Sequence, residues 1–224
     1  MCGIIGYIGN KEAQPILLSG LKRLEYRGYD SCGMVTYLGS KPALSIRKLP
    51  GKIKSLEALL KKRPLAGTVG IGHCRWATHG APNQANAHPH LDCGADIAVV
   101  HNGIIENYLQ LKNELLRKGH RFKSSTDTEV IVHLIEELYR NVSLQEACRS
   151  ALKRLKGSFA IGVISKKEPD KIIGARLGSP LVVGAGARGE NFLASDVSAL
   201  LDFTRDAVFL NDNEMVVLTR EDLI

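Results

Sequence analysis

Apolar residues near the start of the chain predict a strand followed by a helix. Residues 4–8 form a short apolar run of strand length, and Pro15 suits the first turn of a helix. The apolar positions of that helix share one face and are Ile16, Leu17, Leu21 and Leu24. The next expected elements are strands at 32–37, 44–49 and 69–76 and a helix at 55–62.

The middle of the chain has the periodicity of helices. A helix over 107–118 closes at Gly119, and two later segments match the capping-box pattern S/T-x-x-E. These segments are residues 126–129 and 143–146. Each precedes an apolar stripe, so two amphipathic helices are expected, with Cys148 on the core face of the second.

Short apolar runs return after Gly157 and predict strands separated by turn residues. They lie at 159–165, 172–176, 181–185, 192–195, 208–210 and 215–219. Their links are too short for parallel crossovers, so the sheets should be antiparallel. With helices grouped apart from strands, the sequence predicts one α+β domain over 1–224, in which two stacked sheets are flanked by helices.

Composition limits the class of protein. The 224 residues are 44% apolar and 24% charged, which excludes a disordered chain. No apolar run approaches the ~18 residues that cross a bilayer, and the start lacks a secretion signal, so no membrane partner is expected. The five cysteines are odd in number and irregularly spaced, which fits a reducing cytoplasm better than a disulfide framework.

The net charge of +7 is concentrated in one segment. Residues 41–63 hold eight basic side chains against Glu57 alone. Nucleic-acid binding is one interpretation of such a segment, but it lacks stacking aromatics and a recognised binding motif. A solvated face or a contact with another domain is the preferred interpretation, and no nucleic-acid partner is expected.

Cys2 is a candidate nucleophile because of its position. It directly follows Met1 and precedes a buried strand. Removal of Met1 would free an α-amine with a pKa of about 8 beside a thiol with a pKa of about 8.5, so base and nucleophile would share one residue. The alternative is a cysteine that merely follows the start codon.

Four further residues could assist such a nucleophile. Asn102 and Gly103 end an expected strand at a turn, where an amide side chain and a backbone N–H can form an oxyanion hole, although Asn-Gly is also an ordinary turn. Arg75 has the planar fork that binds carboxylates, or is a surface charge. Asp127 lies in the first turn of a helix, where it can receive an ammonium group or simply cap the helix.

The polar stretch 77–96 is long enough to be functional and is rich in histidine. His88 and His90, with Cys93 nearby, raise the possibility of zinc, but no second Cys/His pair at zinc spacing supports it. A Cys/His dyad is also possible, although no single histidine stands out as the base. We expect loop or supporting histidines, with no metal and no cofactor.

Seven motifs are distributed along the chain. They are Cys2-Gly3-Ile4-Ile5-Gly6, Leu24-Glu25-Tyr26-Arg27-Gly28-Tyr29-Asp30-Ser31, Arg75-Trp76-Ala77-Thr78-His79-Gly80, Asn86-Ala87-His88-Pro89-His90, His101-Asn102-Gly103-Ile104-Ile105-Glu106-Asn107, Thr126-Asp127-Thr128-Glu129 and Glu190-Asn191-Phe192-Leu193-Ala194-Ser195-Asp196. Together they resemble the glutaminase domains of the isomerising glutamine:fructose-6-phosphate amidotransferases, which are class II glutamine amidotransferases. The resemblance covers the whole chain in the family's order.

The resemblance implies an N-terminal nucleophile hydrolase fold, with four layers and two antiparallel sheets between helical layers. It implies Cys2 as nucleophile, Asn102 and Gly103 as oxyanion donors, and Arg27 as a residue that positions the N-terminus. It further implies a glutamine pocket, formed by Arg75, Trp76, Thr78, His79 and Asp127. The chain departs from the family's usual residues at Cys32, Cys74, Ala81 and Ser125.

The implied activity is hydrolysis of L-glutamine to glutamate and ammonia for the synthesis of glucosamine 6-phosphate from fructose 6-phosphate. Nothing in the chain resembles the family's sugar-phosphate isomerase domain, so this synthase domain is the expected partner, in a full-length protein expected to be a homodimer. Three alternatives remain: amidophosphoribosyltransferase, another N-terminal cysteine amide hydrolase, and a basic binding module without enzymatic activity.

Overall fold

The structure is a computed structural model that describes residues 2–39, 42–76, 80–187 and 189–224. Twelve strands in the described residues form two sheets in which every strand pair is antiparallel. The first sheet has the order β11-β9-β10-β1-β4-β2-β3. Its strands are β1 (Gly3–Ile8), β2 (Ser31–Leu38), β3 (Ala43–Pro50), β4 (Val69–Arg75), β9 (Val182–Ala185), β10 (Asn191–Ala194) and β11 (Asp206–Phe209).

The second sheet has the order β12-β8-β7-β6-β5. Its strands are β5 (His90–Leu91), β6 (Ile97–Ile105), β7 (Gly157–Ser165), β8 (Ile172–Leu177) and β12 (Met215–Leu218). The helices are α1 (Ala13–Leu24), α2 (Ile53–Lys62), α3 (Tyr108–Arg117), α4 (Thr128–Leu138) and α5 (Leu144–Leu152). Two 3-10 turns, η1 (Glu25–Arg27) and η2 (Val197–Ala199), complete the described elements.

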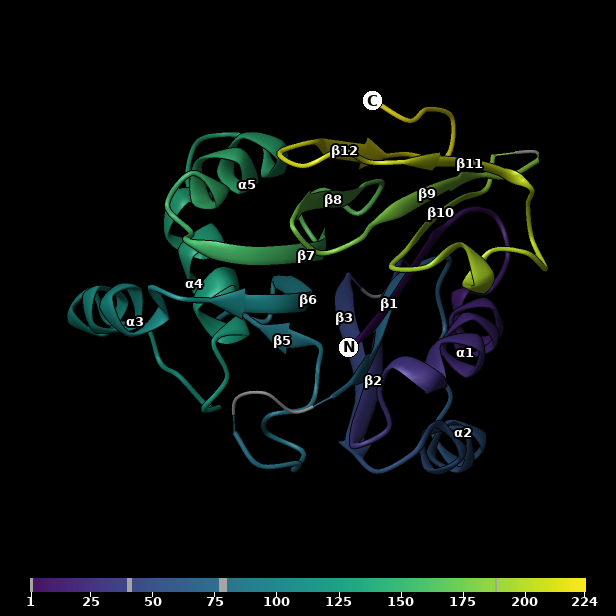
Figure 1. The fold of residues 1–224 in the computed structure, drawn as a ribbon, viewed down its shortest axis with the longest axis horizontal. Helices are drawn as coiled ribbons and strands as arrows, with labels where there is room; N and C mark the ends of the chain where they lie inside the picture. Colours follow the sequence, from purple (N-terminus) through teal and green to yellow (C-terminus); the bar gives the residue numbers. More distant parts are fainter. Residues whose placement is uncertain (1, 40–41, 77–79, 188) are drawn as a thin grey trace.

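Three hydrophobic cores separate four layers, with α1 and α2 on one side and α4 and α5 on the other (Figure 1). The alternation of side chains along each strand produces this arrangement. In β1, Ile5 and Tyr7 face the core under α1 and α2, whereas Ile4 and Ile8 face the core between the sheets. In β6, Val99 packs toward α4, and Val100 packs between the sheets. The expected α+β fold with two stacked antiparallel sheets is therefore confirmed.

Two expectations about local structure were wrong. Residues 126–129 form no capping box: Asp127 is the N-cap of α4 without a side-chain cap, and the Glu129 carboxylate instead accepts the backbone N–H groups of Lys123 and Ser124, each at 2.7 Å. Asn102 and Gly103 do not lie at a turn after a strand, because β6 continues through them to Ile105. The second capping box, Ser143 with Glu146, is present.

The segment 77–96 contains the short strand β5, which its polar composition concealed. Within the basic segment, Lys48 points its Nζ at three carbonyl oxygens, of Ala85, Ala87 and Pro89, rather than at solvent. Cys148 is fully buried in α5, as expected. Among the described helices, none combines the length and apolar character that a membrane span requires.

Candidate active site

Cys2 stands directly before β1, which lies inside the first sheet with β10 on one side and β4 on the other. Its sulfur accepts a hydrogen bond from the Trp76 N–H at 3.2 Å and lies 3.5 Å from the Trp76 carbonyl oxygen. Burial raises the pKa of the Cys2 thiol, and the hydrogen bond from the Trp76 N–H partly offsets this effect. The side chain remains partly accessible.

Two side chains hold the Cys2 carbonyl oxygen from different elements. Arg27 Nε, at the end of η1, donates to it at 3.1 Å, and Asn102 Nδ2, in β6, donates to it at 3.1 Å. Arg27 Nη1 also pairs with Asp196 Oδ2 at 3.2 Å. The structure therefore fixes the position of Cys2 by contacts with both sheets.

His73 orients the Asn102 amide. Its Nε2 lies 3.0 Å from Asn102 Oδ1 and 3.0 Å from the His101 carbonyl oxygen. Both partners are acceptors, so Nε2 carries the hydrogen. Burial lowers the pKa of His73 to about 3, which keeps the ring neutral. With Oδ1 held in this way, Nδ2 must point toward Cys2.

Gly103 has a left-handed backbone, with φ of 126° inside β6. A Cβ at this position would collide with the Ser158 carbonyl oxygen on the neighbouring strand. Only glycine fits this conformation and this close approach. The peptide that joins Asn102 to Gly103 therefore departs from regular strand geometry beside the nucleophile candidate.

Four histidines that the structure describes, His73, His88, His90 and His101, form a buried stack. The rings of His73 and His88 stack with centroids 4.2 Å apart, and His88 Nε2 and His101 Nδ1 lie 2.8 Å and 2.9 Å from the Thr128 hydroxyl. His90 Nε2 lies 3.1 Å from the Thr126 hydroxyl. Burial lowers the pKa values of His88 and His90. These rings support the site as neutral groups.

Arg75 ends β4 with a buried side chain, not a surface charge, and its Nη2 donates to the Gly80 carbonyl oxygen at 3.2 Å. The backbone of Arg75 passes close to Gly28. A Cβ added at Gly28 would lie only 2.7 Å from the Arg75 carbonyl carbon, so a side chain does not fit at this position. Trp76 is 46% exposed and meets Tyr29 edge to face at 5.3 Å. Thr78 and His79 lie outside the described residues.

Asp127 is buried at the N-terminus of α4 and faces β6. Its Oδ2 accepts the Ile105 N–H at 2.8 Å. The carboxylate thus lies near the end of the strand that carries Asn102 and Gly103 and does not cap its own helix. Cys2, Arg27, Asn102 and Trp76 are joined by direct contacts, whereas Arg75 and Asp127 approach from β4 and α4.

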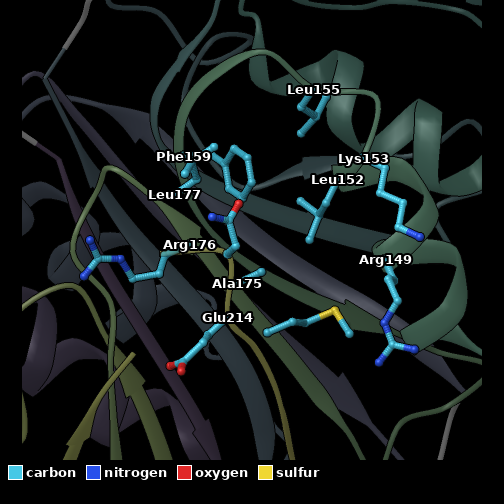
Figure 2. Close-up of a pocket in the computed structure, with 11 residues that line it drawn as sticks. Arg149, Leu152, Lys153, Leu155, Phe159, Ala175, Arg176, Leu177 and Glu214 are labelled. Atoms are coloured by element: carbon cyan, nitrogen blue, oxygen red, sulfur yellow. The ribbon is translucent and has the colours of Figure 1, made fainter. Parts of the chain in front are cut away.

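Residue types alone did not single out His73, Thr128, Asp196 or Asn86. Asn86, Thr128 and Asp196 lie within quoted motifs and His73 lies in none, but the contacts of all four form only when distant segments meet. Asn86, for example, donates to Ala81 O at 2.9 Å and accepts from Ser125 N at 3.0 Å. A cavity of about 460 Å³ lies between α5 and the second sheet. Its lining, part of which Figure 2 shows, includes none of the expected site residues.

Comparison with known proteins decides the family. The model of a glutamine amidotransferase domain matches residues 61–220, which is more than half of the chain. The chain belongs to the glutamine amidotransferases. It is 53% identical over 225 residues to a glutamine–fructose-6-phosphate aminotransferase (isomerizing) of Thermococcus kodakarensis, and 54% identical over 221 residues to that of Thermus thermophilus. These matches cover 100% and 99% of this chain but only 37% and 36% of the relatives.

Solved structures confirm the fold of this amidotransferase domain. The phosphoribosylpyrophosphate amidotransferase of B. subtilis superposes with a TM-score of 0.85 at 28% identity over 100% of this chain and 48% of its own. A glutamine aminotransferase class-II domain protein of Silicibacter pomeroyi, at TM-score 0.65 and 15% identity over 100% of this chain and 97% of its own, shares the fold. The higher identity to the fructose-6-phosphate enzymes favours that branch over amidophosphoribosyltransferase, as the motifs predict.

Proposed function

We propose that this domain hydrolyses L-glutamine to glutamate and ammonia through a thioester on Cys2. The observation that carries the proposal is the position of Cys2. It directly precedes a central strand, its carbonyl oxygen is bound by Arg27 and Asn102, and its sulfur is bound by the Trp76 N–H. Family membership supplies the substrate class.

The reaction begins at the sulfur. After Met1 is removed, the α-amine of Cys2 takes the thiol proton, and the thiolate attacks the side-chain amide carbon of glutamine. The carbon–nitrogen bond then breaks, and the nitrogen leaves as ammonia with the proton that the amine held. Water attacks the resulting thioester, which releases glutamate and restores the thiol.

Asn102 and Gly103 are proposed to stabilise the oxyanion of both tetrahedral intermediates. The Asn102 amide nitrogen has two hydrogens, and the Cys2 carbonyl uses one of them. The second hydrogen and the Gly103 N–H, in the irregular peptide of β6, are the two donors assigned to this role. Because His73 fixes the amide, these donors need little reorganisation during the reaction.

We assign the recognition of glutamine to two charged side chains, each opposite in sign to the glutamine group that it binds. Arg75 is proposed to bind the α-carboxylate and Asp127 the α-ammonium group, with Trp76, Thr78 and His79 as further parts of the pocket. Support comes from position and chemistry: the planar fork of Arg75 suits a carboxylate and lies at the end of β4, and the Asp127 carboxylate lies at the N-terminus of α4 beside the strand that carries Asn102 and Gly103.

Ammonia from this site would serve a synthase domain that forms glucosamine 6-phosphate from fructose 6-phosphate, in a homodimeric cytoplasmic protein. The relatives' names and their greater length support the missing synthase domain, since the chain spans about 36–37% of their length. The five cysteines without disulfides suit the cytoplasm.

The test is glutamine turnover by Cys2→Ala beside a matched control, Cys32→Ala. Cys32 is buried in β2 at a position where alanine is common in the family, so its replacement should leave turnover within about twofold. Cys2→Ala should abolish turnover and labelling by a glutamine-analogue electrophile. Residual turnover in Cys2→Ala, at the level of the control, would disprove the proposal.

A further inference from the structure

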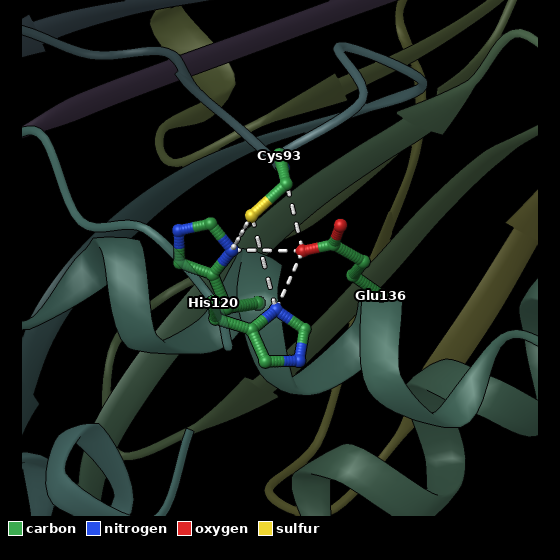
Figure 3. A group of neighbouring side chains, drawn as sticks. Cys93, His120 and Glu136 are labelled. Atoms are coloured by element: carbon green, nitrogen blue, oxygen red, sulfur yellow. Dashed lines mark hydrogen bonds and ion pairs between the residues drawn. The ribbon is translucent and has the colours of Figure 1, made fainter. Parts of the chain in front are cut away.

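Cys93 lies beside two histidines other than those close to it in sequence. Its sulfur is 3.7 Å from His133 Nδ1 and 4.0 Å from His120 Nδ1, and both of these nitrogens lie 2.8 Å from the same oxygen, Oε2 of Glu136. One ligand atom from each residue lies within 4.8 Å of all the others. Figure 3 shows the sulfur of Cys93, the ring of His120 and the carboxylate of Glu136 pointing toward one another.

We propose that Cys93, His120, His133 and Glu136 form a zinc site. One sulfur, two imidazole nitrogens and one carboxylate oxygen make a complete tetrahedral set of the ligands that zinc prefers. A thiolate and a carboxylate also balance the two positive charges of the ion when both imidazoles are neutral. Four protein ligands leave no open position, so the site would be structural and not catalytic.

The distances suit a tetrahedron after a small adjustment. Zinc at about 2.0–2.1 Å from nitrogen and oxygen and about 2.3 Å from sulfur separates its ligands by about 3.3–3.6 Å. The two sulfur–nitrogen distances, 3.7 and 4.0 Å, are slightly longer than this range. The two nitrogen–oxygen distances of 2.8 Å must open by about 0.5 Å, which a turn of the Glu136 side chain can supply.

The outer nitrogens of both rings face other carboxylates. His120 Nε2 lies 3.2 Å from Glu137 Oε2, and His133 Nε2 lies 3.8 Å from Glu129 Oε1. Metal-binding histidines are commonly oriented by such a carboxylate on the far nitrogen. A neutral imidazole has one N–H, so it cannot donate to carboxylates from both nitrogens. With zinc at Nδ1, His120 Nε2 would donate to Glu137, whereas His133 Nε2 faces Glu129 from beyond hydrogen-bond distance.

Three backbone segments fix the ligands before any ion binds. Cys93 lies in the β5–β6 turn, where Asp92 Oδ1 accepts the N–H groups of Asp96 and Ile97 at 2.7 and 2.8 Å. His120 follows Gly119 at the end of α3, and its N–H donates to Leu115 O at 3.1 Å in a Schellman-type helix end. His133 and Glu136 are three residues apart on one face of α4.

The sulfur of Cys93 has a backbone donor and lies at the surface. The Arg121 N–H donates to Cys93 Sγ at 3.4 Å, which holds the sulfur in place. A surface cavity of about 310 Å³, lined by Cys93, Gly119, His120 and Glu136 among others, gives an ion access to the ligands. Binding would release the thiol proton to solvent.

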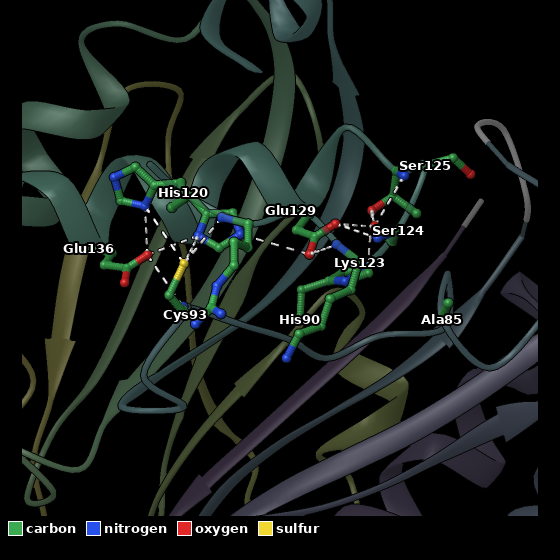
Figure 4. Close-up of polar contacts among 12 residues, drawn as sticks. Ala85, His90, Cys93, His120, Lys123, Ser124, Ser125, Glu129 and Glu136 are labelled. Atoms are coloured by element: carbon green, nitrogen blue, oxygen red, sulfur yellow. Dashed lines mark hydrogen bonds and ion pairs between the residues drawn. The ribbon is translucent and has the colours of Figure 1, made fainter. Parts of the chain in front are cut away.

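The site would tie the β5–β6 turn and the end of α3 to α4. Figure 4 shows that Glu129 lies between the cluster and Ser124, and the Glu129 carboxylate accepts from both Ser124 N and Ser124 Oγ at 2.7 Å. Loaded zinc would therefore also hold the loop that leads into the N-terminus of α4.

The experiment uses the whole chain, freed of metal with a chelator and titrated with Co²⁺ and then with Zn²⁺. Cobalt bound to a thiolate gives a sulfur-to-metal charge-transfer band, and competition with a chromophoric chelator gives the zinc affinity. We expect one equivalent of either metal. Zinc at 100 times its Kd should raise Tm by about 5–10 °C.

Four variants assign the ligands and provide controls. Cys93→Ser should remove the charge-transfer band, and Cys93→Ser and His120→Ala should each weaken zinc binding by at least about 100-fold. Lys118 lines the same cavity but offers no zinc ligand, so Lys118→Ala should change the zinc affinity by no more than about twofold. Cys2→Ser should keep the band, which separates this site from chelation by the N-terminal cysteine.

Some results would overturn the assignment. One is the absence of stoichiometric binding to the unmodified chain at micromolar zinc. Another is a band that survives Cys93→Ser or disappears in Cys2→Ser. Because His120 lies at the surface cavity, His120→Ala tests the site even where Cys93→Ser fails to fold. None of these measurements depends on glutaminase activity, so failure of the zinc site and failure of the proposed function remain distinguishable.

Discussion

The side-chain oxygen of Asn102 lies 3.0 Å from Nε2 of His73, a ring that burial keeps neutral. The amide has two ends, and only one orientation directs its N–H donors toward Cys2. His73 selects that orientation because it offers a hydrogen to the oxygen end. It is therefore a positioning residue for the proposed oxyanion donor and has no contact with glutamine in the proposed mechanism.

Loss of this contact should lower kcat with little change in KM. Asn102→Ala removes the donor itself and should reduce kcat by about 10²-fold or more, because the donor acts on charge that develops in the transition state. His73→Ala should have a smaller effect in the same direction, and His73→Gln, which can place an N–H near the same point, should restore part of it. Steady-state glutaminase kinetics check both. A raised KM with unchanged kcat would contradict these roles.

Glutamine recognition should require both of its charges. Arg75→Lys keeps a positive charge but loses the planar fork, so kcat/KM should fall by at least about tenfold. N-acetyl-glutamine lacks the ammonium group that Asp127 is proposed to bind and should be a poor substrate. Parallel kinetics with glutamine and N-acetyl-glutamine provide the measurement. Comparable turnover of the two substrates would exclude the role of Asp127.

Retention of Met1 should abolish activity. An amide nitrogen is not basic, whereas the α-amine of a processed Cys2 has a pKa near neutrality and can take the thiol proton. Activity should rise in proportion to the Met-free fraction when an aminopeptidase treats partly processed material. Intact mass and glutaminase rate, measured on the same samples, test this. Activity that is independent of processing would require a base other than the amine.

Acid should destabilise the domain below about pH 6.5. Burial depresses the pKa values of His73, His88 and His90, so the folded state stays neutral while the unfolded state binds protons. The stabilisation from these neutral rings is thus fully present above about pH 6.5, the pKa of histidine in the unfolded chain, and is lost as the pH falls below it. Three such groups give a slope of up to about 4 kcal/mol per pH unit near pH 5.5. Urea unfolding between pH 5 and 7.5 measures it, and a flat profile there would refute neutral burial.

Local pattern predicted much of the fold. The apolar run at 4–8 predicts the buried strand β1, whose Ile4 and Ile5 lie in different cores, and the stripe of α1 and the capping box at Ser143 are also visible in the sequence. The box at 126–129 matched equally well but failed, because Glu129 found backbone donors in the preceding loop. Sequence spacing cannot distinguish these two outcomes, since tertiary contacts compete with the local cap.

The site was less accessible to sequence reasoning than the fold. Cys2, Arg27, Asn102 and Asp127 were named from position and motif, and the structure places the first three in contact. The sequence did not predict the two histidines that lie beside Cys93, and the reason is physical. His88 and His90 are close to it in sequence but belong to the buried stack, whereas His120 and His133 reach it through α3 and α4.

The placement of β1 makes the state of one chain end depend on a distant part of the sequence. Ile5 pairs with Gly72 on one side and with Ala194 on the other, so the strand behind Cys2 is completed only when a segment almost 190 residues later is available. During synthesis on the ribosome, the strand that supports Cys2, the proposed nucleophile, cannot be completed until nearly the whole domain has emerged. Until then, Cys2 lacks the strand contacts that hold it in place, so an incomplete chain should not release ammonia from glutamine.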